Sequence, residues 1–232
     1  MKLLFINGKY LGKVRLTQEA LDCLKKFKKI AIYTTTQFSH RIPEIIKQLE
    51  KLGIEVVSSQ PERTSEKAQI LGCDIYHGNL NINEEFEAYL YIGDGNFHPR
   101  ALLFYEHNSD SDRKVVVFNP KSNKIEVLDN KEIEKILIKE ETNLKRFLIA
   151  GNIGILITTK PGQEHWHYIN DLGKKYPDKN FYSFVTDNIS FSEMENFPFI
   201  QAWVNTACPR IGAEDLFNTD KALVNVESVL KI

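Results

Sequence analysis

Two cysteines in unusual surroundings are the residues of this sequence best suited to chemistry. Cys73 follows a glycine, which lets the backbone approach a ligand and adopt unusual dihedral angles. Cys208 precedes Pro209 and Arg210, so the chain is fixed just after the thiol and a nearby cation favours a thiolate or binds an anion. A lone cysteine is also commonly a small buried hydrophobe, and that alternative stays open for both. Cys23 lies between leucines on a predicted helix and is best interpreted as core filler.

Two loops, each between a predicted strand and a predicted helix, are suited to binding a negative group. In the first, Gly93, Gly95 and Asn96 precede a helix whose N-terminus favours phosphate or carboxylate. In the second, residues 158–163 (TTKPGQ) bring hydroxyls, a cation and a glycine together, which suits an anion or an amino acid. The second loop lacks the spacing of a Walker A motif. Neither loop identifies a ligand by itself.

A strand–helix–strand pattern positions these loops in both halves of the chain. The repeat predicts parallel sheets, whose functional loops lie at the carboxyl ends of the strands. Each copy is followed by one cysteine, so the repeat places Cys73 and Cys208 at equivalent positions. We expect an α/β protein with two related Rossmann-like domains, whose mainly parallel sheets are flanked by helices. The predicted strands are 29–33, 54–57, 86–92, 115–118, 153–157 and 180–185, and the predicted helices are 19–27, 42–52 ending at Gly53, 99–106, 131–141 and 164–176.

Length and composition limit the function further. The chain has 232 residues, 42% hydrophobic and 26% charged, with a net charge of −1. This suffices for two α/β domains, expected at 1–125 and 126–232. Near-neutral charge gives no footprint for direct nucleic-acid binding, and no apolar run is long enough for a membrane helix. The apolar run at residues 3–6 is too short for a signal peptide, so we expect a cytoplasmic protein. In that compartment the three widely spaced cysteines are not expected to form a disulfide framework.

Four motifs together resemble the diphthamide-synthesis family, in its archaeal type. They are LGCD at 71–74, IGDGNFHPRAL at 92–102, TTKPGQ at 158–163 and VNTACPRIGAED at 204–215. They occur in the family's order, and the last is the most specific. The resemblance implies similar α/β domains around a centre where each of three domains donates one cysteine to a [4Fe-4S] cluster. It further implies radical-SAM-like cleavage of S-adenosylmethionine and transfer of a 3-amino-3-carboxypropyl group to a histidine of elongation factor 2.

Carried onto this chain, the resemblance implies that Cys73 and Cys208 are the cluster ligands of the middle and last domains. Three thiolates leave one iron open for the substrate, and no catalytic residue beyond the cluster is implied. Members work as dimers, so a homo- or hetero-oligomer is expected. The residues implied to lie near S-adenosylmethionine are Gly93, Gly95, Asn96, Thr159, Lys160, Gly162, Gln163 and Arg210.

The family's first domain, with its own cysteine, has no counterpart in this sequence. A separate chain is therefore the expected source of the third ligand, although a dimer partner, a non-catalytic paralogue and a truncated reading frame remain open. The leading hypothesis is an enzyme component that is active with that partner. One alternative is a non-catalytic subunit that binds elongation factor 2 or stabilises a catalytic partner. Another is a Rossmann-like anion-binding protein with incidental cysteines.

Overall fold

The computed structural model describes residues 8–109, 111–160 and 162–232. Contacts divide the chain into two units, Met1–Ile133 and Glu134–Ile232. The expected boundary after residue 125 comes too early, because strand β5 (Lys124–Leu128) pairs with strand β4 of the first unit. The apolar run at residues 3–6, and Pro161 in the second loop, lie outside the described residues. No helix among the described residues is long and apolar enough to cross a membrane.

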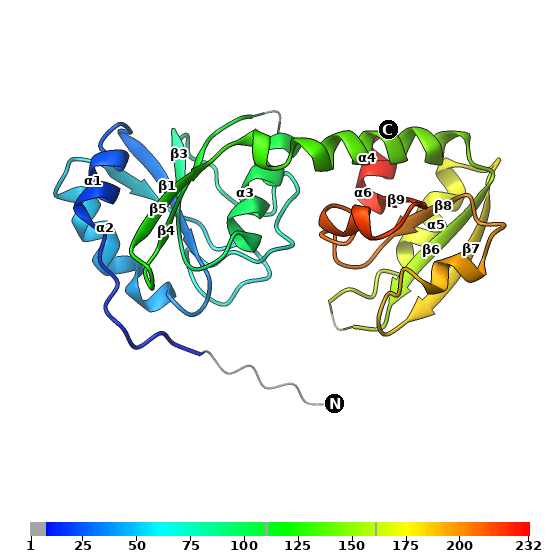
Figure 1. The fold of residues 1–232 in the computed structure, drawn as a ribbon, viewed down its shortest axis with the longest axis horizontal. Coiled ribbons are helices and arrows are strands. Elements are labelled where there is room, and N and C mark those ends of the chain that lie inside the picture. Colours follow the sequence, from blue (N-terminus) through cyan, green and yellow to red (C-terminus); the bar gives the residue numbers. More distant parts are fainter. Residues whose placement is uncertain (1–7, 110, 161) are drawn as a thin grey trace. The chain divides into compact units, whose positions relative to one another are not determined.

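The first unit is a five-stranded sheet with helices on both faces (Figure 1). Its strand order is β2-β1-β3-β4-β5, and only β5 runs antiparallel. Helices α1 and α2 pack on one face, and α3 packs on the other. The bounds are α1 Gln18–Leu24, β1 Lys29–Thr34, α2 Ile42–Glu50, β2 Glu55–Val57, β3 Ala88–Ile92, α3 Phe97–Asn108 and β4 Val115–Asn119, with 3-10 turns at Ser39–Arg41 and Asn130–Glu132.

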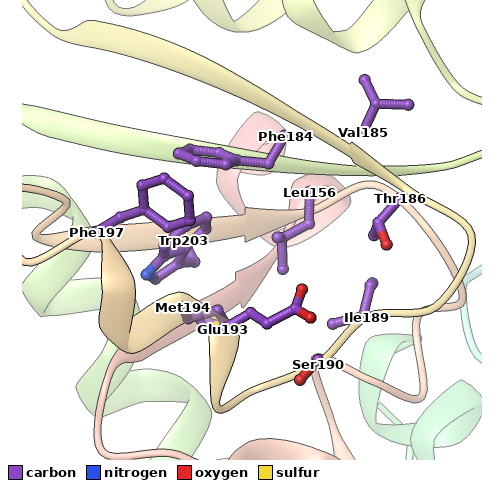
Figure 2. Close-up of a pocket in the computed structure, with 10 residues that line it drawn as sticks. All are labelled: Leu156, Phe184, Val185, Thr186, Ile189, Ser190, Glu193, Met194, Phe197 and Trp203. Carbon is purple, nitrogen blue, oxygen red and sulfur yellow. The ribbon is translucent and has the colours of Figure 1, made fainter.

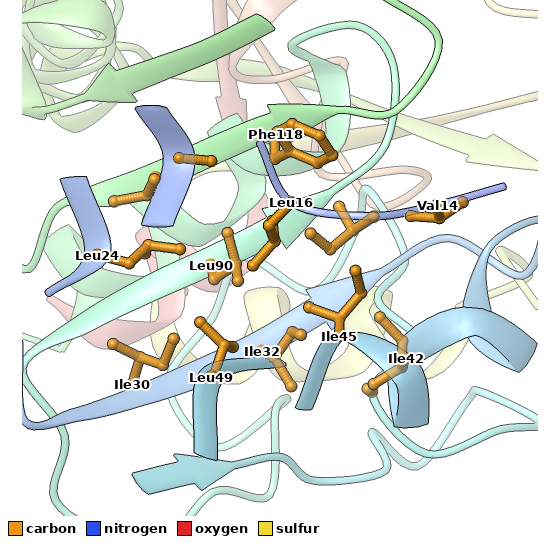
Figure 3. Close-up of a cluster of buried hydrophobic side chains, with 14 of the residues drawn as sticks. Val14, Leu16, Leu24, Ile30, Ile32, Ile42, Ile45, Leu49, Leu90 and Phe118 are labelled. Atoms are coloured by element: carbon orange, nitrogen blue, oxygen red, sulfur yellow. The ribbon is translucent and has the colours of Figure 1, made fainter. Parts of the chain in front are cut away.

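Side chains that alternate along the strands form the core of the first unit (Figure 3). Ile32 and Leu90 project from β1 and β3 toward α2, whose Ile45 and Leu49 are one helical turn apart. All four side chains are fully buried. Gly53, just beyond α2, has the left-handed φ of +77° expected of a residue that ends a helix. This sheet and α2 confirm the predicted strand–helix–strand unit.

The opposite face of this sheet carries buried tyrosines. Tyr89 donates a 2.5 Å hydrogen bond to Glu106 of α3, and Arg113 pairs with the same carboxylate at 3.1 Å. Tyr33 lies 2.5 Å from the hydroxyl of Ser59. Burial raises the pKa of Tyr33 to about 12 despite that hydrogen bond. These groups join the β2–β3 segment and α3 to the sheet.

The second unit is a four-stranded, fully parallel sheet in the order β7-β6-β8-β9. Its core lies between one sheet face and the helices α5 and α6, with Phe147 of α4 included. Asn143 of α4 donates to the main-chain oxygen of Leu223 over 3.0 Å, which satisfies an acceptor on the edge strand β9. The bounds are α4 Glu134–Ile149, β6 Asn152–Thr158, α5 His167–Lys175, β7 Asn180–Thr186, β8 Ala202–Asn205, β9 Ala222–Asn225 and α6 Val226–Lys231, with 3-10 turns at Glu193–Asn196 and Glu214–Asn218.

The two sheets share one topology, which confirms the predicted repeat. The order β2-β1-β3-β4 of the first corresponds to β7-β6-β8-β9 of the second. The expected equivalence of the cysteines is nevertheless wrong. Cys73 lies between β2 and β3, whereas Cys208 lies between β8 and β9, which corresponds to the interval after β3. The repeated motif covers only one strand–helix–strand unit, and both cysteines lie beyond it.

Candidate functional site

The turn that carries Cys73 is anchored at the carboxyl end of β1. The long segment between β2 and β3 passes this end, where the Thr34 amide donates to the Ala68 oxygen (2.8 Å) and the Ile70 amide donates to the Thr34 oxygen (2.9 Å). Residues 71–74 then turn. A Cβ at Gly72 would overlap the ring of Phe97, the first residue of α3, so glycine is required for this close approach. The Cys73 turn therefore lies against the start of α3.

Asp74 fixes the geometry of that turn. Its carboxylate accepts the Leu71 amide at 2.8 Å, and its own amide donates to the Leu71 oxygen at 3.1 Å. The side chain is only 3% exposed. Burial raises the pKa of Asp74, while the Leu71 hydrogen bond and the charge of Arg63 oppose that rise. The turn holds the half-buried Cys73 at the surface of the unit.

Arg63 contacts the Cys73 sulfur. Its Nη1 donates to Cys73 Sγ over 3.2 Å. The sequence prediction missed this residue because it lies ten positions before the cysteine, within an irregular segment. The PERTS turn of residues 61–65 is the one local signal, since Pro and Ser/Thr mark turns without showing where an arginine points.

The glycine turn after β3 lies next to the Cys73 turn through Phe97. Gly95 has a φ of +73°, and a Cβ at Gly93 would collide with the Tyr91 hydroxyl. Asn96 precedes α3 and makes no side-chain capping bond. The structure thus brings the predicted residues Gly93, Gly95 and Asn96 to the same edge of the first unit as Cys73.

Two further groups at this turn were not predicted as site residues. The Lys121 ammonium lies 2.6 Å from Asp94, and this hydrogen bond holds the pKa of Asp94 below its usual value. The Tyr91 hydroxyl is fully buried and has no hydrogen-bond partner among the described residues. Burial raises the pKa of Tyr91, so its phenol is a neutral donor. The turn therefore offers a buried donor beneath Gly93.

Two buried asparagines hold the Cys208 turn at the carboxyl end of β8. Asn205 Nδ2 donates to the Cys208 oxygen (2.9 Å) and to Asn225 Oδ1 (2.8 Å). Asn225 Nδ2 in turn donates to the Pro209 oxygen over 2.8 Å. These asparagines are at most 1% exposed, so the bonds form away from water. The half-buried Cys208 is therefore presented by a rigid backbone.

Arg210 is buried rather than exposed beside the thiol. The residue is 3% exposed and forms an ion pair and a 3.2 Å hydrogen bond with Glu214, four residues further along the chain. Its positive charge is thus largely balanced within the segment. The prediction that Arg210 binds substrate stays a prediction, and its placement favours a role in holding the Cys208 segment.

The predicted loop at 158–163 lies at the carboxyl end of β6, beside the Cys208 segment. Thr206 connects the two, because its amide and its hydroxyl both donate to the Leu156 oxygen (3.1 and 2.8 Å). Thr159 and Lys160 are exposed, and the Thr159 hydroxyl donates to Asp187. The Gln163 amide donates to the Lys160 oxygen at 3.0 Å, and Gly162 has a φ of +76°. The second unit thus gathers its predicted residues at one sheet edge.

A cavity of about 220 Å³ opens on the sheet face opposite α5 (Figure 2). Its walls are mainly apolar, and Trp203 lies two residues before Asn205 on β8. Figure 2 shows the Glu193 carboxylate pointing into the space near Ser190. Sequence reasoning missed this cavity, because residues 187–200 that cover it carry no periodic signal. The lining residues are Leu156, Phe184, Val185, Thr186, Ile189, Ser190, Glu193, Met194, Phe197 and Trp203.

Each unit therefore supplies one thiol on a fixed turn at the carboxyl edge of its own sheet. Within residues 8–109, 111–160 and 162–232, no group of three or more His, Cys, Asp or Glu side chains is placed to hold a metal ion. Among the described residues, Cys73 and Cys208 are half-buried sulfurs that lie beside loops suited to anions.

Comparison with known proteins gives a consistent family. The family described as "Putative diphthamide synthesis protein" matches residues 1–228. The chain is 27% identical to a 2-(3-amino-3-carboxypropyl)histidine synthase of Pyrococcus horikoshii over 206 residues, covering 87% of this chain and 56% of that protein. It is 25% identical to subunit 1 of such a synthase from Neurospora crassa, covering 81% of this chain and 40% of that protein. The chain thus spans about half the length of these relatives.

Solved structures agree with the sequence comparisons. The fold is similar to the crystal structure of Dph2 from Pyrococcus horikoshii, with a TM-score of 0.75 and 26% identity, covering 91% of this chain and 59% of that one. A second structure of that protein, described as containing a 4Fe-4S cluster, gives the same TM-score and identity and covers 92% and 60%.

Proposed function

Because the chain belongs to the diphthamide synthesis family, we propose that it is a component of an iron–sulfur transferase. In this proposal the enzyme transfers a 3-amino-3-carboxypropyl group from S-adenosylmethionine to a histidine of elongation factor 2. The observation that carries the proposal is the pair of half-buried cysteines on fixed turns at the carboxyl edges of two sheets. These edges are where ligands bind in open α/β folds.

The units correspond, in this proposal, to the middle and last domains of a three-domain enzyme. Met1–Ile133 supplies Cys73, and Glu134–Ile232 supplies Cys208. A separate chain supplies the first domain and the third cysteine. This assignment is supported by the shared strand order of the two units and by the fraction of each relative that the chain spans.

The chemistry of the donor set fits a [4Fe-4S] cluster. Thiolates are the usual ligands of such clusters, and both sulfurs are half-buried rather than enclosed in a core. A bound cluster, once reduced, would supply the electron for cleavage of S-adenosylmethionine. The protein's own residues position the ligands: Asp74 and Arg63 act at the first sulfur, and Asn205 acts at the second.

The loops beside the cysteines are proposed to hold S-adenosylmethionine. The buried Tyr91 hydroxyl beneath Gly93 supports a polar contact at the first loop. The exposed Lys160 supports binding of a carboxylate at the second. The proposed binding residues are Gly93, Gly95, Asn96, Thr159, Lys160, Gly162, Gln163 and Arg210. The protein is proposed to act in the cytoplasm within an oligomer, on elongation factor 2 and without direct nucleic-acid binding.

Anaerobic iron–sulfur reconstitution tests this proposal. The purified chain is reconstituted with and without a candidate companion chain, which is expected to have on the order of 100 residues and one cysteine motif. Absorption and electron paramagnetic resonance should show a [4Fe-4S] cluster only when both chains are present. Cys208→Ala should abolish it, whereas Cys23→Ala should leave it intact, because Cys23 packs against the core of the first unit.

The alternative is a non-catalytic subunit that binds elongation factor 2 or stabilises a catalytic partner. The same reconstitution separates the two functions. A stable complex that forms no cluster, and in which the chain still binds elongation factor 2, would support the alternative and contradict the enzyme proposal.

A further inference from the structure

A guanidinium lies against the sulfur of Cys73 in the first unit. The 3.2 Å hydrogen bond from Arg63 joins an exposed arginine to a half-buried thiol. Hydrogen bonds from a charged donor are stronger than neutral ones and favour the anionic form of the acceptor. This contact therefore places a positive charge beside the sulfur that is the proposed cluster ligand.

The main chain around Arg63 is fixed by its own hydrogen bonds. Thr64, 8% exposed, donates to the Pro61 oxygen through both its hydroxyl (2.7 Å) and its amide (3.0 Å). Gln60 Nε2 donates to the Thr64 oxygen at 3.1 Å. A tight turn therefore presents Arg63, and the approach of its side chain to Cys73 does not depend on a mobile backbone.

The carboxylate that follows Cys73 in the sequence is turned inward. The Asp74 carboxylate is 3% exposed and accepts the Leu71 amide. At the other cysteine the arrangement differs, because Arg210 is buried and paired with Glu214. The exposed cation beside a candidate ligand is thus Arg63, not Arg210.

We propose that Arg63 is a positioning residue for Cys73: its hydrogen bond orients the sulfur, and its positive charge lies next to the proposed cluster ligand. The proposal rests on the proposed function, in which Cys73 is a cluster ligand. Hydrogen bonds and positive charge at a cysteinyl sulfur stabilise the reduced, more negative cluster and so raise its reduction potential. At Cys73, Arg63 thereby has an electrostatic role of the kind that the sequence suggests for Arg210 at Cys208.

Paired alkylation of the metal-free, folded chain tests the charge beside the sulfur. Iodoacetate is anionic and iodoacetamide is neutral, so the ratio of their rates at one fixed pH reports local charge and cancels the thiolate fraction. Peptide mass spectrometry follows Cys73, with Cys23 and Cys208 as internal references. Arg63→Gln should lower the ratio at Cys73 several-fold, Arg63→Lys should restore most of it, and the exposed Arg15→Gln should leave it unchanged.

An unchanged ratio in Arg63→Gln would overturn the inference, as would an equal change in Arg15→Gln. In the reconstituted complex, Arg63→Gln should also give a more negative cluster potential than wild type, whereas Arg15→Gln should match wild type. Equal potentials in all three would likewise contradict it. If the wild-type complex forms no cluster, the proposed function fails, and the alkylation ratio alone decides the role of Arg63.

Discussion

The two cysteines are held by different local devices, although each lies at the carboxyl edge of its sheet. At Cys73 a buried carboxylate fixes the turn, and an arginine contacts the sulfur. At Cys208 two buried side-chain amides, Asn205 and Asn225, hold the main chain. At Cys73 a positive charge lies next to the sulfur, whereas at Cys208 neutral amide dipoles contact the main chain. The two sulfurs therefore lie in different electrostatic surroundings.

Two substitutions of Asp74, to Ala and to Asn, distinguish the effect of its hydrogen bond on the turn from the effect of its charge. Asp74→Ala removes the acceptor of the Leu71 amide and should lower the free energy of unfolding by about 1 to 3 kcal/mol. Asp74→Asn keeps an acceptor and avoids burying a charge, so it should be at least as stable as wild type at neutral pH. Urea denaturation measures both. Equal midpoints for wild type and Asp74→Ala would show that the turn does not depend on this bond.

Alanine substitutions at two glycines, one in the turn after β3 and one in α5, should change stability in opposite directions. In Gly93→Ala the added methyl meets the Tyr91 hydroxyl, so the variant should lose about 1 to 3 kcal/mol of stability. Gly173→Ala, at an exposed site in α5 with open space around it, should instead gain about 0.5 to 1 kcal/mol. Thermal unfolding of the two variants checks the signs. A harmless Gly93→Ala would mean that the turn has room to shift.

At the scale of elements, the sequence predicts what is periodic and misses what is short. The run at 29–33 and the helical spacing at 42–52 correspond to β1 and α2. Strands β8 and β9 have four residues each and are buried throughout, so they show no alternation between apolar and polar positions. Helix α6 has only six residues, and β5 is largely exposed. Their short or weak patterns leave no signal in a single sequence.

Some residues of the candidate site can be predicted from the sequence, and others are brought together only by the fold. The motifs around Cys73 and Cys208 are contiguous, so the sequence shows them directly. Arg63 and Phe97 reach the Cys73 turn only through the folding of the β2–β3 segment over the end of β1. Contacts made by an irregular segment cannot be read from spacing.

The buried tyrosine face predicts an alkaline dependence of stability. The pKa of Tyr33 is raised in the folded state from 10.0 to about 12, so the unfolded chain loses this proton first as the pH rises. Its contribution is fully present below pH 10 and is lost between pH 10 and about 12. In that window the free energy of unfolding should fall less steeply for Tyr33→Phe than for wild type. Urea titrations across this range measure the slopes, and identical slopes would contradict the assignment.

At the scale of the whole molecule, the chain carries two α/β units of related topology, and each unit has a half-buried cysteine, Cys73 or Cys208, on a turn at the carboxyl edge of its sheet. It spans 56% of its Pyrococcus horikoshii relative, and the structure of that relative is described with a 4Fe-4S cluster. The proposed function includes a third cysteine ligand in addition to Cys73 and Cys208. We propose that a companion chain supplies it, so that activity should appear only in the assembled complex.

The most direct test is transfer to elongation factor 2. The chain and its companion, reconstituted anaerobically and reduced, are incubated with S-adenosylmethionine and elongation factor 2, and the factor is mapped by peptide mass spectrometry. One histidine peptide should gain the mass of a 3-amino-3-carboxypropyl group, and this gain should be lost with either chain alone or with Cys208→Ala. A complex that contains the cluster and binds elongation factor 2 but leaves it unmodified would contradict the proposed function.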